Sequence, residues 1–210
     1  RLALQGCAPL IDQSRSHGLM FDIGGGSTEL IWMRTEGKRP EMVDSISIPH
    51  GVVSLSERYG EEAICREPYE EIVDDMEERL KTFCRRHQIG DAVRQGNVQM
   101  LGASGTVTTL AGVSLNLPRY DRSMVDGATL DFEEVQSVSE RLRHMACEER
   151  AAHPCIGAER AKLVIAGCAV LEAIMRRWSV GSIRVADRGV REGILFEVMQ
   201  QADAQRDAGH

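Results

Sequence analysis

Two acidic residues flank a run of three glycines near the start of the chain, in Phe21-Asp-Ile-Gly-Gly-Gly-Ser-Thr-Glu29. The short apolar runs on either side predict a β-hairpin, with Asp22 near the end of one strand and Glu29 early in the next. Carboxylates beside a phosphate cradle are where Mg²⁺ and an attacking water belong in phosphoryl transfer. A plain glycine-rich hairpin with exposed charged ends is the alternative, but the adjoining acidic and hydroxyl residues favour a functional site.

The glycines of this hairpin supply the cradle itself. Gly24, Gly25 and Gly26 can adopt positive φ and leave backbone N–H groups accessible, so that an anion can approach closely. Ser27 places a hydroxyl directly after them. We therefore expect residues 24–27 to contact phosphate.

A second glycine loop, residues 102–106, follows a predicted strand and opens a predicted helix. Backbone N–H groups and the helix dipole favour an anion there, which makes Gly102, Ser104, Gly105 and Thr106 further candidate phosphate-binding residues. An ordinary strand–loop–helix junction capped by Ser104 or Thr106 has the same pattern, so this loop alone is weak evidence.

Three arginines are candidates for substrate contact. Arg119 and Arg122 lie in a compact polar loop, 117–122, which could either touch substrate or be closed by Arg–Asp pairs. Arg188 follows the last predicted strand and could meet phosphate or pair with a neighbouring acid such as Asp187. For Arg188 the pairing is the preferred interpretation.

The composition limits the class of protein. The chain has 210 residues, 42% of them hydrophobic, which suits one or two folded domains and excludes a disordered chain. The net charge of −7 argues against DNA binding, and no apolar run is long enough to predict a membrane span. None of the six cysteines has CxxC spacing, so we expect reduced thiols, no zinc site and a cytoplasmic location.

Hydrophobic periodicity predicts the elements that must position these residues. Three strands in a row form an antiparallel meander, and two β-α units follow, with a helical insertion before the last strand. This order predicts an α/β, ribonuclease-H-like layered sheet. Strands are predicted at 19–24, 27–33, 42–48, 98–101 and 182–186, helices at 1–13, 69–83, 106–115, 131–145, 161–178 and 189–199, a polar loop at 121–127 and a loose tail at 200–210.

Taken together, the segments resemble the exopolyphosphatase / guanosine pentaphosphate phosphohydrolase (Ppx/GppA) family of the actin–Hsp70–sugar-kinase superfamily. The octapeptide Asp22-Ile-Gly-Gly-Gly-Ser-Thr-Glu29 is highly specific for it, and the other segments follow in the family's order. The further matching segments are Ile48-Pro-His-Gly51, Gly102-Ala-Ser-Gly-Thr106, Leu117-Pro-Arg-Tyr-Asp-Arg122 and Asp187-Arg-Gly-Val-Arg-Glu-Gly193.

The resemblance implies an activity and a role for each loop. Enzymes of this family remove the terminal phosphate of polyphosphate, or the 5′ γ-phosphate of pppGpp, with Mg²⁺ (or Mn²⁺). By resemblance, Asp22 would bind the metal or orient water and Glu29 would assist it. The two glycine loops would hold phosphates of polyphosphate or of a guanosine penta- or tetraphosphate.

The resemblance also implies a domain organisation. Residues 1–15 would be the remainder of an interdomain helix, 16–200 the second ribonuclease-H-like domain and 201–210 a flexible tail. The first domain, with a second phosphate loop, and the general base would lie upstream of Arg1. We therefore expect this stretch by itself to bind phosphate weakly and to hydrolyse almost nothing, because phosphoryl transfer needs both walls of the cleft.

Two alternatives to hydrolysis stay open from the sequence. A kinase or ATPase of the same superfamily would use the second glycine loop for adenosine. A non-catalytic sensor of (p)ppGpp would bind without hydrolysis. The pattern is compatible with a homodimer, and it does not distinguish a preference for polyphosphate from one for pppGpp.

Overall fold

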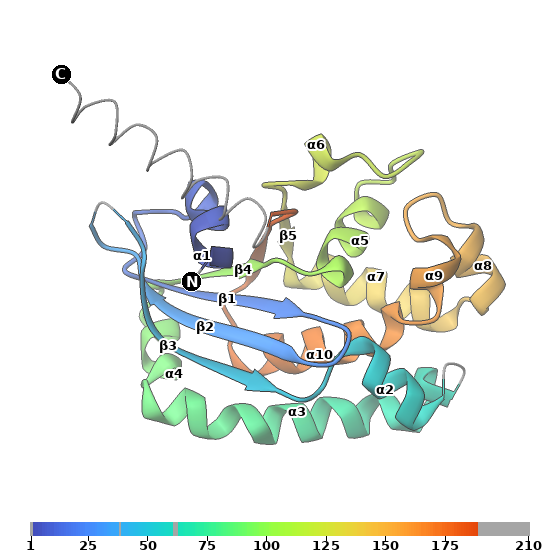
Figure 1. The fold of residues 1–210 in the computed structure, drawn as a ribbon, viewed down its shortest axis with the longest axis horizontal. Coiled ribbons are helices and arrows are strands. Elements are labelled where there is room, and N and C mark those ends of the chain that lie inside the picture. The colour runs from blue at the N-terminus through green and yellow to red at the C-terminus, as the bar shows by residue number, and fades with distance from the viewer. Residues whose placement is uncertain (1, 38, 61–62, 189–210) are drawn as a thin grey trace, which may run out of the picture.

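The computed structural model describes residues 2–37, 39–60 and 63–188, which form a six-stranded sheet with helices on both faces (Figure 1). The strand order is β3-β2-β1-β4-β6-β5. β1, β2 and β3 form the expected antiparallel meander, and β4 and β6 continue the sheet parallel to β1. The strands are β1 His17–Ile23, β2 Thr28–Arg34, β3 Glu41–Ile48, β4 Val98–Gly102, β5 Thr129–Asp131 and β6 Ser182–Val185.

Helices occupy the segments between the strands. The α-helices are α1 Leu2–Cys7, α2 Val52–Tyr59, α3 Glu67–Arg86, α4 Ile89–Arg94, α5 Gly105–Ser114, α6 Arg122–Val125, α7 Phe132–His144, α8 Cys147–Ala152, α9 Gly157–Ala161 and α10 Val164–Arg177. Short 3₁₀ turns span Ala8–Leu10 and Ala63–Cys65. The predicted helix at 189–199 and the tail at 200–210 lie outside the described residues.

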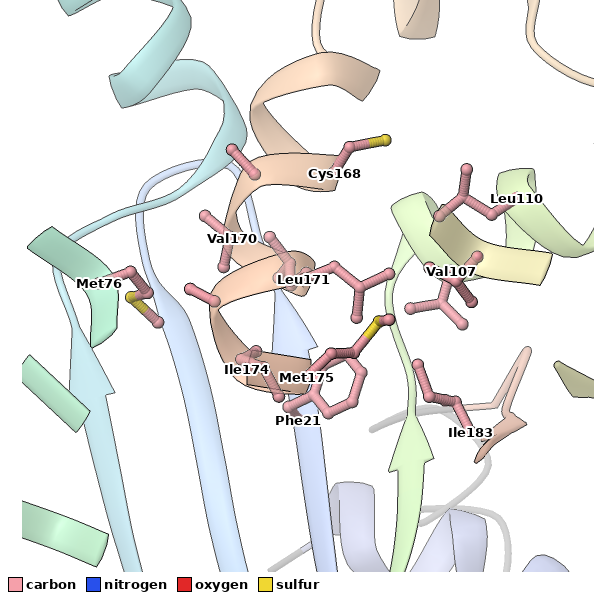
Figure 2. Close-up of a cluster of buried hydrophobic side chains, with 14 of the residues drawn as sticks. Phe21, Met76, Val107, Leu110, Cys168, Val170, Leu171, Ile174, Met175 and Ile183 are labelled. Carbon is pink, nitrogen blue, oxygen red and sulfur yellow. The ribbon is translucent and has the colours of Figure 1, made fainter. Parts of the chain in front are cut away.

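Successive side chains of β1 point to opposite faces of the sheet and so belong to two different hydrophobic clusters. Leu19, Phe21 and Ile23 belong to the larger core, which is closed by α3, α5 and α10, whereas Met20 packs on the other face against α1. Figure 2 shows α10 inside the larger core, with Leu171 pointing toward Val107 of α5. The α10 helix is therefore buried on nearly all sides, as its apolar sequence predicts.

The helix predicted at 69–83 is confirmed as α3, which is amphipathic. Six of its residues are buried at helical spacing: Tyr69, Ile72, Val73, Met76, Leu80 and Phe83. The acidic side of this helix is largely exposed, and several of its carboxylates pair with cations of α3 or α10. An acidic face of this kind is typical of a solvent-exposed helix surface.

Several predicted boundaries were wrong. The helix predicted at 1–13 ends at Cys7, because Pro9 has no N–H to donate and the chain passes into a 3₁₀ turn. The helix predicted at 161–178 corresponds to α10, which begins at Val164 and ends at Arg177, and residue 161 belongs to the preceding helix α9. In the predicted loop 121–127 Asp121 caps the single turn of α6, its carboxylate accepting the N–H of Ser123.

Several elements had no prediction, among them β5 and the helices α2, α4 and α8. The β5 strand has only three residues, too few for a period to be visible, and it exists because it pairs with β6. The α2 helix begins at the glycine hairpin and is described with the site below. Among the described residues no helix is long and apolar enough to cross a membrane.

Candidate phosphate and cation site

Asp22 and Glu29 are direct cross-strand partners in the β1–β2 hairpin. Residues opposite each other in an antiparallel pair point to the same face, so the two carboxylates lie side by side. Glu29 is held in place, since the hydroxyls of Ser27 and Ser47 both donate to its Oε1, the latter over 3.1 Å. Its Oε2 accepts no hydrogen bond from a described residue and is open to a further ligand.

The environment of Asp22 disfavours its charged form. Its side chain is exposed to solvent at the end of β1, but the surrounding protein removes part of its hydration, and the charge of Glu29 lies opposite. Together these effects raise the pKa of Asp22 from 3.8 to about 6. A bound cation would stabilise the ionised form of both carboxylates, because it offsets their mutual repulsion and the lost hydration.

The glycine turn is a compact four-residue connection. The N–H of Gly24 donates to the carbonyl of Ser27 over 2.9 Å, which closes residues 24–27. Positive φ is possible at these glycines, but none of the three adopts it. The turn instead needs glycine for close approach at Gly24, whose added Cβ would lie 3.1 Å from the carbonyl oxygen of Ser27.

The start of α2 packs directly on this turn. The N–H of Val52 donates to the carbonyl of Gly24, and that of Val53 to the carbonyl of Gly25, both over 2.9 Å. Gly51 is the point of closest contact, since a Cβ there would lie 2.4 Å from the carbonyl carbon and oxygen of Gly25. The carbonyls of Gly24 and Gly25 are thus occupied, while no described residue accepts the N–H groups of Gly25 and Gly26.

The second glycine loop is a capped helix start, as predicted. The Oγ of Ser104 accepts the N–H of Val107 over 3.2 Å, so Ser104 is the N-cap of α5. Thr106 is buried against Gly167 of α10, and Gly102 is packed against Phe21, so these two residues have clear packing roles. Gly105 is exposed at the first turn of the helix.

A cavity of about 200 Å³ joins the two loops. Gly24 and Gly25 line one side, and Gly105 and Thr106 line another. Ile23 also lines it, and because neighbouring residues of a strand point to opposite faces, Asp22 lies on the other side of the strand end. The site therefore has two parts, the carboxylate pair and the cavity, with the glycine turn between them.

One cation of this cavity was missed by sequence reasoning. Arg160 of α9 lines it and donates from Nη1 to Oγ1 of Thr109 over 3.0 Å. Its guanidinium carbon lies 5.9 Å from the ring centre of Tyr120. The same atom lies next to the first turn of α5, since it would be 4.0 Å from a Cβ added to Gly105. The helical spacing of the insertion gave no signal for this residue, because α9 has only five residues.

The three predicted substrate-contact arginines lie beyond the cavity lining. Arg122 pairs with Asp187 over 3.6 Å, and Arg188 pairs with Asp126 over 2.6 Å rather than with its neighbour in sequence. Arg119 is exposed in the loop before α6. The Arg–Asp pairs hold the 117–126 loop on the end of β6, and a substrate role for these arginines stays a prediction.

The carboxylate pair fits a hard divalent cation. Among the described residues there is no group of three or more His, Cys, Asp or Glu side chains that could hold a metal ion. Mg²⁺, however, is commonly bound by one or two carboxylates and completes its shell with water and phosphate oxygens. Asp22 and Oε2 of Glu29 offer that donor set next to exposed backbone N–H groups.

The sheet order, the meander and the glycine loops define a domain of the actin-like fold. Its likeness to solved structures is clear. It aligns with an exopolyphosphatase-like protein (TM-score 0.79, 25% identity, 94% of this chain and 63% of that one). It also aligns with the Ppx/GppA family member of Aquifex aeolicus (TM-score 0.75, 24% identity, 95% of this chain and 61% of that one). A third alignment is with an exopolyphosphatase from Cytophaga hutchinsonii (TM-score 0.72, 20% identity, 95% of this chain and 62% of that one).

A model of the Ppx/GppA phosphatase family matches residues 1–202. The chain therefore belongs to the Ppx/GppA phosphatase family. It spans about three fifths of the length of the similar structures.

Proposed function

We propose that this chain is a domain of a Mg²⁺-dependent phosphoanhydride hydrolase that removes the terminal phosphate of polyphosphate, the 5′ γ-phosphate of pppGpp, or both. The observation that carries the proposal is the position of the glycine turn between the Asp22–Glu29 pair and a cavity lined by the second glycine loop. In this proposal an extended phosphate chain passes over the glycine turn and so contacts both parts. Family membership supports hydrolysis over the kinase alternative.

Each group of the site has a role that follows from its position. When bound, Mg²⁺ supplies positive charge for the phosphoryl oxygens that become more negative in the transition state. Asp22 and Glu29 would hold it, and Asp22 would also orient an attacking water. The N–H groups of Gly25 and Gly26 and of the first turn of α5 bind phosphate oxygens.

We propose further that a separate domain supplies the other wall of the cleft. Catalysis of phosphoryl transfer depends on positioning and on a site from which water is excluded, and one side of such a site has little effect by itself. The chain's span of about three fifths of the similar structures supports this division. The second wall would carry the general base.

The test compares this chain with the longest native form of the protein that carries it. Both are titrated with tripolyphosphate and with pppGpp in the presence of Mg²⁺, and phosphate release is measured. We expect binding by both and release only by the longer form. Release by this chain alone that Asp22→Ala abolishes would contradict the two-wall proposal, and binding without release by either form would identify a sensor.

Arg160 provides a second test of the phosphate site. Replacing it with methionine keeps most of the side-chain volume and removes the charge, so we expect the affinity for tripolyphosphate to fall roughly 10- to 100-fold, the effect of a lost charge-assisted hydrogen bond. Isothermal titration calorimetry measures this. Arg34→Met is the matched control, because Arg34 lies at the far end of β2 and pairs weakly with Glu41 at 3.8 Å. Equal losses in both variants would mean that only net charge matters.

A further inference from the structure

His50 is a buried histidine that joins α3 to the glycine hairpin. Only 7% of its side chain is exposed, and its Nε2 lies 2.6 Å from Oδ2 of Asp75. Partial burial alone would raise the pKa of Asp75, but hydrogen bonds from Arg79 and His50 outweigh this effect and lower it. Asp75 is therefore ionised at neutral pH and accepts the Nε2–H of His50.

The backbone around His50 is fixed from two further sides. Its carbonyl accepts the hydroxyl hydrogen of Thr28, the first residue of β2, over 2.6 Å. The next residue, Gly51, is the one that contacts the Gly25 carbonyl so closely that no Cβ fits. His50 thus links Asp75 of α3 to the segment where α2 begins beside the glycine turn.

This contact decides which way the glycine N–H groups point. In a trans peptide the C=O and the following N–H point in opposite directions, and the described residues contain no cis peptide. Since the carbonyls of Gly24 and Gly25 accept N–H groups of α2, the N–H groups of Gly25 and Gly26 are directed away from α2. Moving α2 would release the carbonyls and let both peptides rotate.

One of the two ring nitrogens of His50 lacks a hydrogen bond. Its Nδ1 is buried and has no hydrogen-bond partner among the described residues. A buried polar nitrogen without a partner costs stability, so packing alone does not account for histidine at this position.

We propose that His50, oriented by Asp75, is a positioning residue that holds α2 on the glycine turn and so aims the N–H groups of Gly25 and Gly26 at phosphate. This inference rests on the proposed function, because the phosphate is the ligand assigned there. His50 acts through the backbone and does not itself touch the substrate.

The chain contains a matched control for the test. His87, at the other end of α3, lies 2.7 Å from Oδ2 of Asp44 on β3, so it makes the same kind of pair far from the glycine turn. The variants are His50→Ala, Asp75→Asn and His87→Ala. Asp75→Asn keeps the packing of the site and serves if His50→Ala fails to fold.

Two measurements are made on each variant of this chain: the ¹H–¹⁵N resonances and hydrogen exchange of Gly25 and Gly26, and the affinity for Mg²⁺-tripolyphosphate. We expect His50→Ala to shift both resonances, to accelerate exchange and to weaken affinity roughly tenfold, with smaller changes in the same direction for Asp75→Asn. His87→Ala should lower Tm and leave both measurements unchanged.

Unchanged Gly25 and Gly26 resonances in His50→Ala and Asp75→Asn, or equal shifts in His87→Ala, would overturn the inference. The resonances report the backbone in the absence of ligand. If the unmodified chain does not bind tripolyphosphate at all, the proposed function fails, while the resonances still decide whether His50 positions the turn.

Discussion

Asp22→Asn is expected to raise the melting temperature of the metal-free protein at pH 7.5 and to abolish its stabilisation by Mg²⁺. The folded state raises the pKa of Asp22 to about 6 from an ordinary value of 3.8, so above pH 6 it carries an ionised carboxylate that the unfolded chain accommodates more easily. Below about pH 4 the carboxyl is neutral in both states, and this cost disappears. The increase in melting temperature that the substitution causes should therefore become smaller as the pH falls from 6 to 4.

Thermal denaturation across this pH range, with and without millimolar Mg²⁺, measures both effects. A ligand that binds only the folded state raises its stability, so the unmodified protein should gain Tm with Mg²⁺ at pH 7.5 and little at pH 4.5. In the longer native form the same substitution should reduce phosphate release to background. Asp91→Asn, on exposed α4, is the charge-matched control, and an Mg²⁺ shift that survives in Asp22→Asn would place the cation elsewhere.

The second large effect is expected at Gly51. In Gly51→Ala the new Cβ would be 2.4 Å from the carbonyl carbon and oxygen of Gly25, and both atoms belong to backbone that cannot rotate away without breaking the contact with α2. Forced overpacking of this kind costs about 1–3 kcal/mol, and we expect the upper end, about 3 kcal/mol. For a chain of this length the Tm should fall by roughly 6–12 °C.

Gly26→Ala is the matched control for Gly51→Ala, because no heavy atom lies within 4 Å of a Cβ at position 26. Its Tm should stay close to that of the unmodified protein. Urea denaturation of the three proteins gives the free energies of unfolding. A Gly51→Ala protein as stable as Gly26→Ala would show that α2 does not need to pack on the turn as closely as the structure places it.

The part of the site that could be predicted is the part encoded locally. The Asp22–Glu29 pairing follows from two short strands and a four-residue connection, and the cap of α5 by Ser104 follows from its place after a strand. Such features depend on neighbours within a few residues, and for these the sequence pattern is sufficient.

The parts that were missed depend on contacts between distant segments. Arg160 reaches the cavity because α9 brings it beside α5, and nothing in its neighbours in sequence indicates this. The conformation of the glycine turn, in which no glycine adopts positive φ, also could not be predicted, because α2 packs on the turn and its N–H groups donate to the carbonyls of Gly24 and Gly25. The need for glycine at position 51 likewise comes from the backbone of residue 25.

The register of the β1–β2 hairpin makes the length of its turn part of the chemistry. Asp22 faces Glu29 because four residues, 24–27, separate the paired Ile23 and Thr28. Inserting or deleting one residue there would shift one strand against the other, and a shift of one position sends every side chain of that strand to the opposite face. A variant that keeps every acidic and glycine residue but has one residue more or fewer in this turn would no longer place the two carboxylates side by side. The number of residues in the turn therefore matters to the site as much as their identity.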